Sequence, residues 1–105
     1  MFKPETFMVQ KLNYTIMLFY SNINEDSLKA RVMIKKFMET YGDSLKITIK
    51  EINFELEKEL SYKFGVMGTP AVIFLKNGIL IRRHFGEITQ EEFKSIIKSN
   101  YFNNI

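Results

Sequence analysis

The pattern of hydrophobic and polar positions divides the chain into alternating strands and helices. Tyr14–Tyr20 is apolar on both faces and rich in β-forming residues, which predicts a strand buried inside a sheet. Three further segments with β-branched or aromatic residues are predicted strands: 45–54, 71–75 and 79–85. The alternation of the first of these slips near Lys50 and Glu51, which indicates a bulge at that point.

Three segments carry apolar residues at helical spacing. The first is expected to begin after a cap at or near Asn24 and to end at Gly42. Its buried stripe consists of Ala30, Met33, Ile34, Phe37 and Tyr41. A short helix is predicted over 55–64. A final helix is predicted after Thr89, where Glu92 completes a capping box.

The order of these elements predicts an α/β protein with a mixed central sheet of four to five strands and helices on both faces. The early strands need helical crossovers and are therefore parallel. Asn77-Gly78 favours a tight antiparallel hairpin between the last two strands. A chain of 105 residues is expected to form one domain over 1–105. Residues 1–12 would be a peripheral N-terminal segment and 102–105 a tail.

Composition removes several kinds of chemistry. The chain has no cysteine and one histidine, His84, so it cannot form a disulfide, a thiolate metal site or a thiol nucleophile. We therefore expect no metal and no cofactor. The net charge of +3 comes from interleaved charges, so we expect no nucleic-acid partner. No run near the start, including Ile16–Tyr20, is long enough for a leader or a membrane span, which predicts a cytoplasmic protein without a membrane partner.

Several short motifs resemble those of the thioredoxin family. Phe64–Pro70 reads FGVMGTP, is followed by an apolar strand and Lys76-Asn77-Gly78, and is similar to the family's Gly-x-Pro segment, strand and Lys-Asn-Gly turn. Gly86 also matches a family glycine, and Phe19-Tyr20 stands where the family has Phe-Trp. The resemblance covers about residues 14–101. It implies a thioredoxin-like fold with a cis proline at Pro70.

The chain departs from this family at the residues that carry its chemistry. By the resemblance, Asn24 stands at the position of the nucleophilic cysteine and Ser27 at that of the resolving cysteine. Leu18 stands at the position of the buried acid, and Val32 at that of a helix proline. Dithiol exchange needs a thiolate and a second thiol, so these residues predict a protein that is not an enzyme and is redox-inactive.

The retained residues suggest recognition of a protein or peptide partner. The resemblance implies that the backbone before Pro70, at Thr69, pairs with an extended peptide. Ile23 stands where the family has an exposed tryptophan, and we expect it to form a small apolar patch with Met67, Thr69 and Pro70. Gly86 belongs to the same candidate set. It is equally consistent with the sequence that the proline is kept only because the fold needs it.

The sequence leaves open the role of two acidic residues, Glu25 and Asp26, and two other functions for the whole chain. Glu25 and Asp26 either stabilise the start of a helix or form an acidic lip that selects basic partner segments. The chain could instead be an enzyme that binds glutathione or another thiol through a hydroxyl, from Ser27 or Tyr20. It could also be a purely structural subunit of a larger complex.

Overall fold

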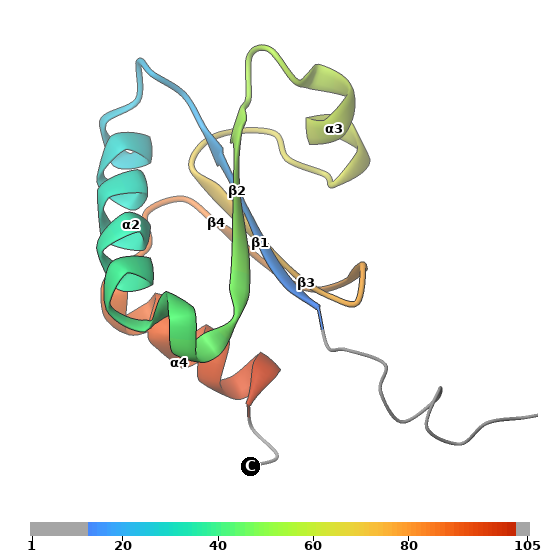
Figure 1. Ribbon diagram of the computed structural model, residues 1–105. Helices are drawn as coiled ribbons and strands as arrows, with labels where there is room; N and C mark the ends of the chain where they lie inside the picture. Colours follow the sequence, from blue (N-terminus) through green and yellow to red (C-terminus); the bar gives the residue numbers. More distant parts are fainter. Residues whose placement is uncertain (1–12, 103–105) are drawn as a thin grey trace, which may run out of the picture.

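The computed structural model describes residues 13–102, so the expected N-terminal segment 1–12 and residues 103–105 of the expected tail lie outside the described residues. Within them the chain forms a four-stranded sheet and three helices (Figure 1). In chain order the elements are β1 (Tyr14–Tyr20), α2 (Glu25–Leu45), β2 (Ile47–Asn53), α3 (Lys58–Lys63), β3 (Ala71–Lys76), β4 (Ile79–Phe85) and α4 (Gln90–Tyr101). None of the helices described is both long and apolar enough to cross a membrane.

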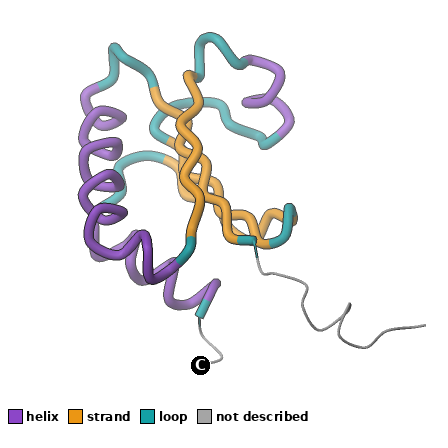
Figure 2. Tube along the Cα trace, viewed as in Figure 1, coloured by secondary structure: helices purple, strands orange, loops and turns teal. Residues whose placement is uncertain are grey.

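The sheet is mixed, as the sequence predicts. Its strand order is β2-β1-β3-β4. β1 pairs in parallel with β2 and antiparallel with β3, and β4 completes the antiparallel hairpin with β3. Helices α2 and α4 lie on one side of the sheet and α3 lies on the other (Figure 2). The predicted α/β class, with helices on both faces of a mixed sheet, is therefore confirmed.

The core has two parts because alternate residues of the central strands point to opposite faces. Ile16 and Leu18 of β1 face α2 and α4, and Met17 and Phe19 face the side of α3. The larger part includes residues from both long helices: Ala30, Ile34, Phe37, Phe93, Ile96, Ile97 and Tyr101. The central strands are buried on both faces, which explains why β1 reads as a continuous apolar run.

The bulge predicted near Lys50 and Glu51 is wrong. β1 and β2 stay in register along their whole length, from Tyr14–Ile47 to Tyr20–Asn53. The pattern slips because Glu51 occupies a position on the α2 side of this outer strand, where its carboxylate pairs with Arg31 of α2. The one register shift in the sheet that the structure describes lies between β3 and β4.

Two helix boundaries differ from the prediction. α2 passes through Gly42 and ends at Leu45, where Lys46 adopts a left-handed conformation (φ 56°) and its N–H donates to the Gly42 carbonyl. α3 begins only at Lys58, because the Asn53 side chain accepts a hydrogen bond from the Leu56 N–H (3.1 Å) and holds a turn before the helix. The predicted helix 55–64 is therefore too long at its start.

The C-terminal boundary of the fold lies later than expected. Tyr101 is the buried last residue of α4, and its hydroxyl donates to the carbonyls of Thr15 (3.2 Å) and Leu75 (2.9 Å). Phe102, predicted to begin the tail, packs its ring against Tyr14 with centroids 5.3 Å apart. Phe102, the first residue of the predicted tail, is therefore packed as part of the fold.

Candidate functional site

Asn24 and Ser27, which the resemblance assigns to the positions of the family's cysteines, both form local hydrogen bonds. Asn24 is the N-cap of α2, and its side-chain oxygen accepts a hydrogen bond from the Ser27 N–H at 2.8 Å. The Ser27 side chain is fully buried, and its hydroxyl accepts a hydrogen bond from the Ser21 N–H at 3.2 Å. The Ser21 hydroxyl in turn accepts from the Ile23 N–H at 3.3 Å. These bonds fix the connection between β1 and α2 without offering a nucleophile.

The other two substituted positions are also accounted for by packing. Leu18 is fully buried in the core between β1 and the long helices, so no carboxylate lies where the family's acid would be. Val32 lies on an unbroken α2 and is half exposed. Leu18 therefore supplies hydrophobic stabilisation to the core.

A shallow groove lies beside the Thr69–Pro70 peptide bond, which is cis. Its volume is about 300 Å³. It is lined by Gly65, Met67, Gly68, Thr69, Pro70, Phe85 and Gly86, and we call it the ledge groove. Pro70 is buried and its carbonyl accepts a hydrogen bond from the Gly86 N–H at 2.8 Å, which extends the β3–β4 pairing. Gly86 has φ +88°, a conformation that disfavours a side chain at this point.

Most residues of the patch that the sequence predicts lie close together in the structure. Met67, Thr69, Pro70 and Gly86 line the ledge groove. Ile23 is not among the lining residues, but β1 reaches Tyr20 beside the start of β3, where Phe19 pairs with Ala71. Ile23 and Met67 are the most exposed large hydrophobic side chains described, at 93% and 92%. The expected exposure of Ile23 is therefore observed.

The backbone of Thr69 is open to a partner. Among the residues that the structure describes, its N–H and C=O take part in no backbone hydrogen bond. Thr69 directly precedes Pro70, whose carbonyl already pairs with Gly86. Unpaired backbone groups that adjoin a strand are able to pair with the backbone of an added peptide.

Among the residues described, the titratable groups near the ledge groove form no arrangement typical of a catalytic site. His84 is half-buried rather than fully exposed, and its Nε2 lies 2.9 Å from the Glu87 carbonyl. No group of three or more potential metal ligands occurs within residues 13–102. The pKa of Arg31 is raised, chiefly by its hydrogen bonds to Glu51, but this pair lies on the α2 side of β2 and not in the ledge groove.

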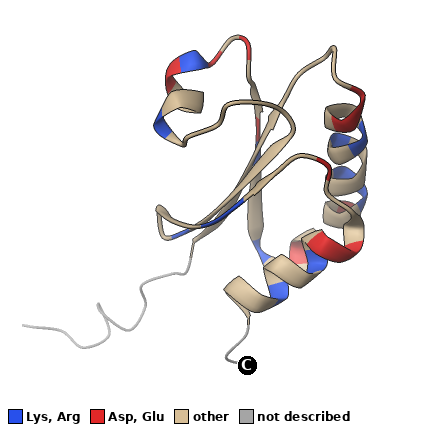
Figure 3. Cartoon of the chain, turned by 180° about the vertical axis from the view of Figure 1, so that it is seen from behind, with Lys and Arg blue, Asp and Glu red and all other residues tan. Residues whose placement is uncertain are grey.

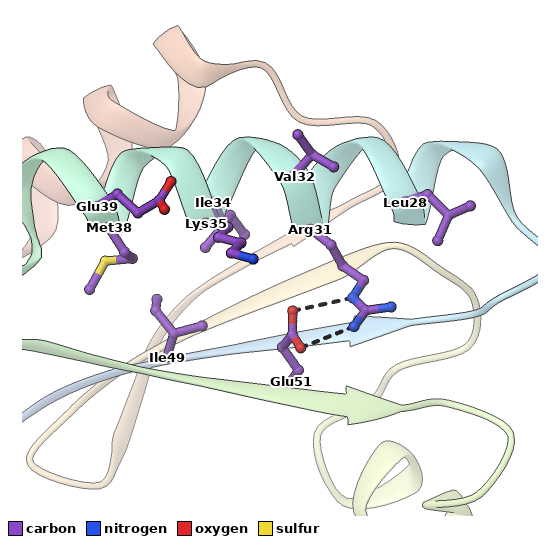
Figure 4. A pocket seen from close by; sticks show the side chains of 9 residues that line it. All are labelled: Leu28, Arg31, Val32, Ile34, Lys35, Met38, Glu39, Ile49 and Glu51. Atoms are coloured by element: carbon purple, nitrogen blue, oxygen red, sulfur yellow. Dashed lines mark hydrogen bonds and ion pairs between the residues drawn. The ribbon is translucent and has the colours of Figure 1, made fainter.

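A second, larger hollow lies elsewhere, between α2 and β2. Figure 4 shows the side chains that line it, which come from α2 and β2. Its volume is about 800 Å³. Arg31 and Glu51 cross it with two hydrogen bonds of 3.2 Å, and the guanidinium lies 4.2 Å from the centre of the Tyr20 ring. This pair satisfies both of its charges, and the rest of the lining is mostly apolar, with Lys35 and Glu39 beside it.

Sequence reasoning missed several residues of this region. Phe85 and the glycines Gly65 and Gly68 line the ledge groove beside the predicted residues. Phe85 ends an outer strand and directly precedes Gly86, and that position could have indicated an exposed ring. Leu56 lies within the helix predicted over 55–64, but the observed helix starts after it and its side chain is exposed.

Comparison with solved structures finds the same fold in several thioredoxins. A malarial protein shares 19% identity with this chain at a TM-score of 0.76, covering 85% of this chain and 98% of its own. Thioredoxin-2, described as a component of malaria parasite protein secretion machinery, shares 20% identity at a TM-score of 0.77, covering 87% and 86%. A mutant thioredoxin from Halobacterium salinarum shares 17% identity at a TM-score of 0.73, covering 83% and 74%.

Two comparisons of sequence complete the assignment. No curated protein sequence matches the chain. The thioredoxin family model matches residues 6–99, which is most of the chain. The layered sheet, the shared fold and this match agree with one another, although the positions of both thiols hold other residues. The chain is thus a member of the thioredoxin family, one that contains no cysteine.

Proposed function

We propose that this chain is a redox-inactive binding module of one domain that recognises an extended segment of a protein partner at the ledge groove. The observation that carries the proposal is the combination of an unpaired Thr69 backbone with two almost fully exposed apolar side chains, Ile23 and Met67. We expect it to act in the cytoplasm. The partner's backbone would pair with Thr69 and its side chains would contact the groove.

The buried hydroxyl and the capping amide support the redox-inactive part of the proposal. Thiol–disulfide exchange proceeds by thiolate attack on a disulfide sulfur. Neither Asn24 nor Ser27 can provide that attack, and each is already used in a local hydrogen bond. In an insulin reduction assay with dithiothreitol, we expect no rate above that of dithiothreitol alone. A clear acceleration would contradict this part.

Binding of glutathione through a hydroxyl is disfavoured by where the two candidate hydroxyls lie. Ser27 is fully buried, and the ring of Tyr20 is covered by the Arg31 guanidinium on the α2 side. Neither residue lines the ledge groove. A hydroxyl that is to hold a thiol must face the groove that binds the rest of the ligand, and these two do not.

Paired charge substitutions test the binding part. Met67→Glu places a charge in the ledge groove, and Ile23→Glu places one on the exposed connection between β1 and α2. Ile79→Glu places one on the other end of β4, where Ile79 is also exposed. In affinity capture from the native host, we expect a partner that is retained by the Ile79 variant and lost from the other two. Equal retention by all three variants would contradict binding at this groove.

A further inference from the structure

The exposed apolar surface of this protein is concentrated around the ledge groove. The four most exposed large hydrophobic side chains described are Ile23 (93%), Met67 (92%), Tyr62 (86%) and Leu56 (80%). Figure 1 shows the β1–α2 connection, the α3 region and the α3–β3 loop around the same end of the sheet. A contiguous group of exposed apolar residues typically marks an interaction surface.

Hydrogen bonds hold the parts of this surface to one another. The Phe54 N–H donates to the Tyr20 carbonyl at 2.9 Å, which ties the approach to α3 to the end of β1. The Gly65 N–H donates to the Tyr62 carbonyl at 3.1 Å, and Gly65 lines the ledge groove. α3 is therefore tied to Gly65 at the groove, and we expect a bound segment longer than the groove to reach it.

Negative charge surrounds this apolar surface although the whole chain is positive. The segments 20–29, 53–70 and 85–89 contain six carboxylates and three lysines, a formal charge of −3 in a chain whose net charge is +3. The carboxylates are Glu25, Asp26, Glu55, Glu57, Glu59 and Glu87. Figure 3 shows acidic positions at the start of α2 and around α3 at this end of the molecule. Arg83 also reaches the region, with its Nη1 3.4 Å from the Phe64 carbonyl, and brings the local charge to −2.

These carboxylates are largely free to meet a partner's charges. In the part of the chain that the structure describes, only Glu25 among them forms an ion pair, with Lys29 at 3.9 Å, and both side chains are mostly exposed. Helix stabilisation accounts for Glu25, Asp26 and Glu59, which lie in the first turns of helices. It does not account for Glu55 or Glu87, which lie in connections.

We propose that the ledge groove selects an extended partner segment in which apolar residues are flanked by lysines or arginines. This inference rests on the proposed function and adds the chemistry of the partner to it. The apolar residues would contact Ile23, Met67 and Tyr62, and the flanking cations would face the surrounding carboxylates. Complementary charge at the rim of an interface contributes mainly to selectivity and to the rate of association.

Two short synthetic peptides test this chemistry. They share an extended apolar centre, Val-Leu-Val-Ile, and differ only in being flanked by lysines or by glutamates. In amide chemical-shift titrations of the whole chain, we expect the lysine peptide to shift Ile23, Met67, Thr69 and Gly86, and to bind at least about fivefold more tightly than the glutamate peptide. The difference should shrink as sodium chloride is raised.

Matched variants locate the source of the selectivity. Asp26→Asn combined with Glu57→Gln should reduce the preference for lysine to about twofold or less. Glu39→Gln combined with Asp43→Asn removes the same charge from exposed positions towards the other end of α2, and should leave the preference unchanged.

The outcomes separate the two proposals. Equal binding of both peptides with shifts at the ledge groove would overturn the charge selection and leave the proposed function standing. Shifts confined to α2 or β4 would overturn the location of the site. Binding of neither peptide at millimolar concentration would count against both proposals.

Discussion

Replacing Ser27 by alanine removes a buried hydroxyl that holds the connection between β1 and α2. The hydroxyl accepts the Ser21 N–H at 3.2 Å, and its side chain is 0% exposed. Ser21 is itself only 2% exposed, so water cannot supply a substitute acceptor. A buried N–H left without a partner costs about 1–3 kcal/mol.

One effect opposes this loss. Ser27 lies in the first turn of α2, where alanine is a better helix former than serine by about 0.5 kcal/mol. The net effect on the free energy of unfolding should therefore be a decrease of about 1.5 kcal/mol. For a domain of this size, that corresponds to a Tm lower by roughly 6–10 °C.

Urea unfolding followed by circular dichroism measures this change directly. Ser95→Ala is the matched control because Ser95 is exposed on α4, where the same substitution should be neutral or slightly stabilising. If Ser27→Ala were as stable as Ser95→Ala, the hydroxyl would not be structural, and our account of Ser27 as a structural residue would be refuted.

Three further substitutions test other contacts. Thr89→Ala removes the hydrogen bond that the Glu92 N–H donates to the Thr89 hydroxyl, and should lower the free energy of unfolding by about 1 kcal/mol. The bond that the Thr89 N–H donates to the Glu92 carboxylate remains, and it lowers the pKa of Glu92 below its ordinary 4.5, so its stabilisation is present above that pH and lost as pH falls below it. Glu92→Gln should therefore flatten urea midpoints measured across that range. Burial raises the pKa of the Tyr101 hydroxyl above its ordinary 10.0, so the stabilisation by the neutral hydroxyl is complete below pH 10 and is lost as pH rises further. Tyr101→Phe should remove this alkaline decrease in Tm, and should lower the free energy of unfolding by about 1–2 kcal/mol at neutral pH. Glu51→Gln breaks the partly exposed pair with Arg31 and should cost at most about 1 kcal/mol in thermal unfolding, with a smaller loss at high salt.

The sheet could be predicted from sequence because its central strands leave little choice. β1 and β3 are apolar on both faces and Asn77-Gly78 fixes the hairpin between β3 and β4, where Asn77 adopts the positive φ (53°) that such a turn requires. The capping box at Thr89 could also be predicted, since its two residues, Thr89 and Glu92, lie close together in sequence. Local chemistry decides these features, so a single sequence contains enough information.

Features that depend on contacts between different elements, or on an uncommon backbone conformation, could not be predicted from the sequence. Glu51 broke the strand pattern because its partner, Arg31, lies on a different element. The end of α2 was misplaced because Lys46 adopts a left-handed conformation that is uncommon for a lysine. At the site, the resemblance alone assigned Asn24 and Ser27 to the positions of the family's cysteines. Only the structure shows that the two side chains now cap the helix and hold Ser21.

The most direct test of the account is a photo-crosslinking experiment at the ledge groove. A benzophenone amino acid replaces Met67 in one variant and Ile79 in another, both exposed, and each is irradiated in the native host and analysed by mass spectrometry. The account predicts that the Met67 variant crosslinks to an extended segment of a specific protein, and that this product disappears when Ile23→Glu is added. Identical products from both variants, or products unaffected by Ile23→Glu, would contradict it.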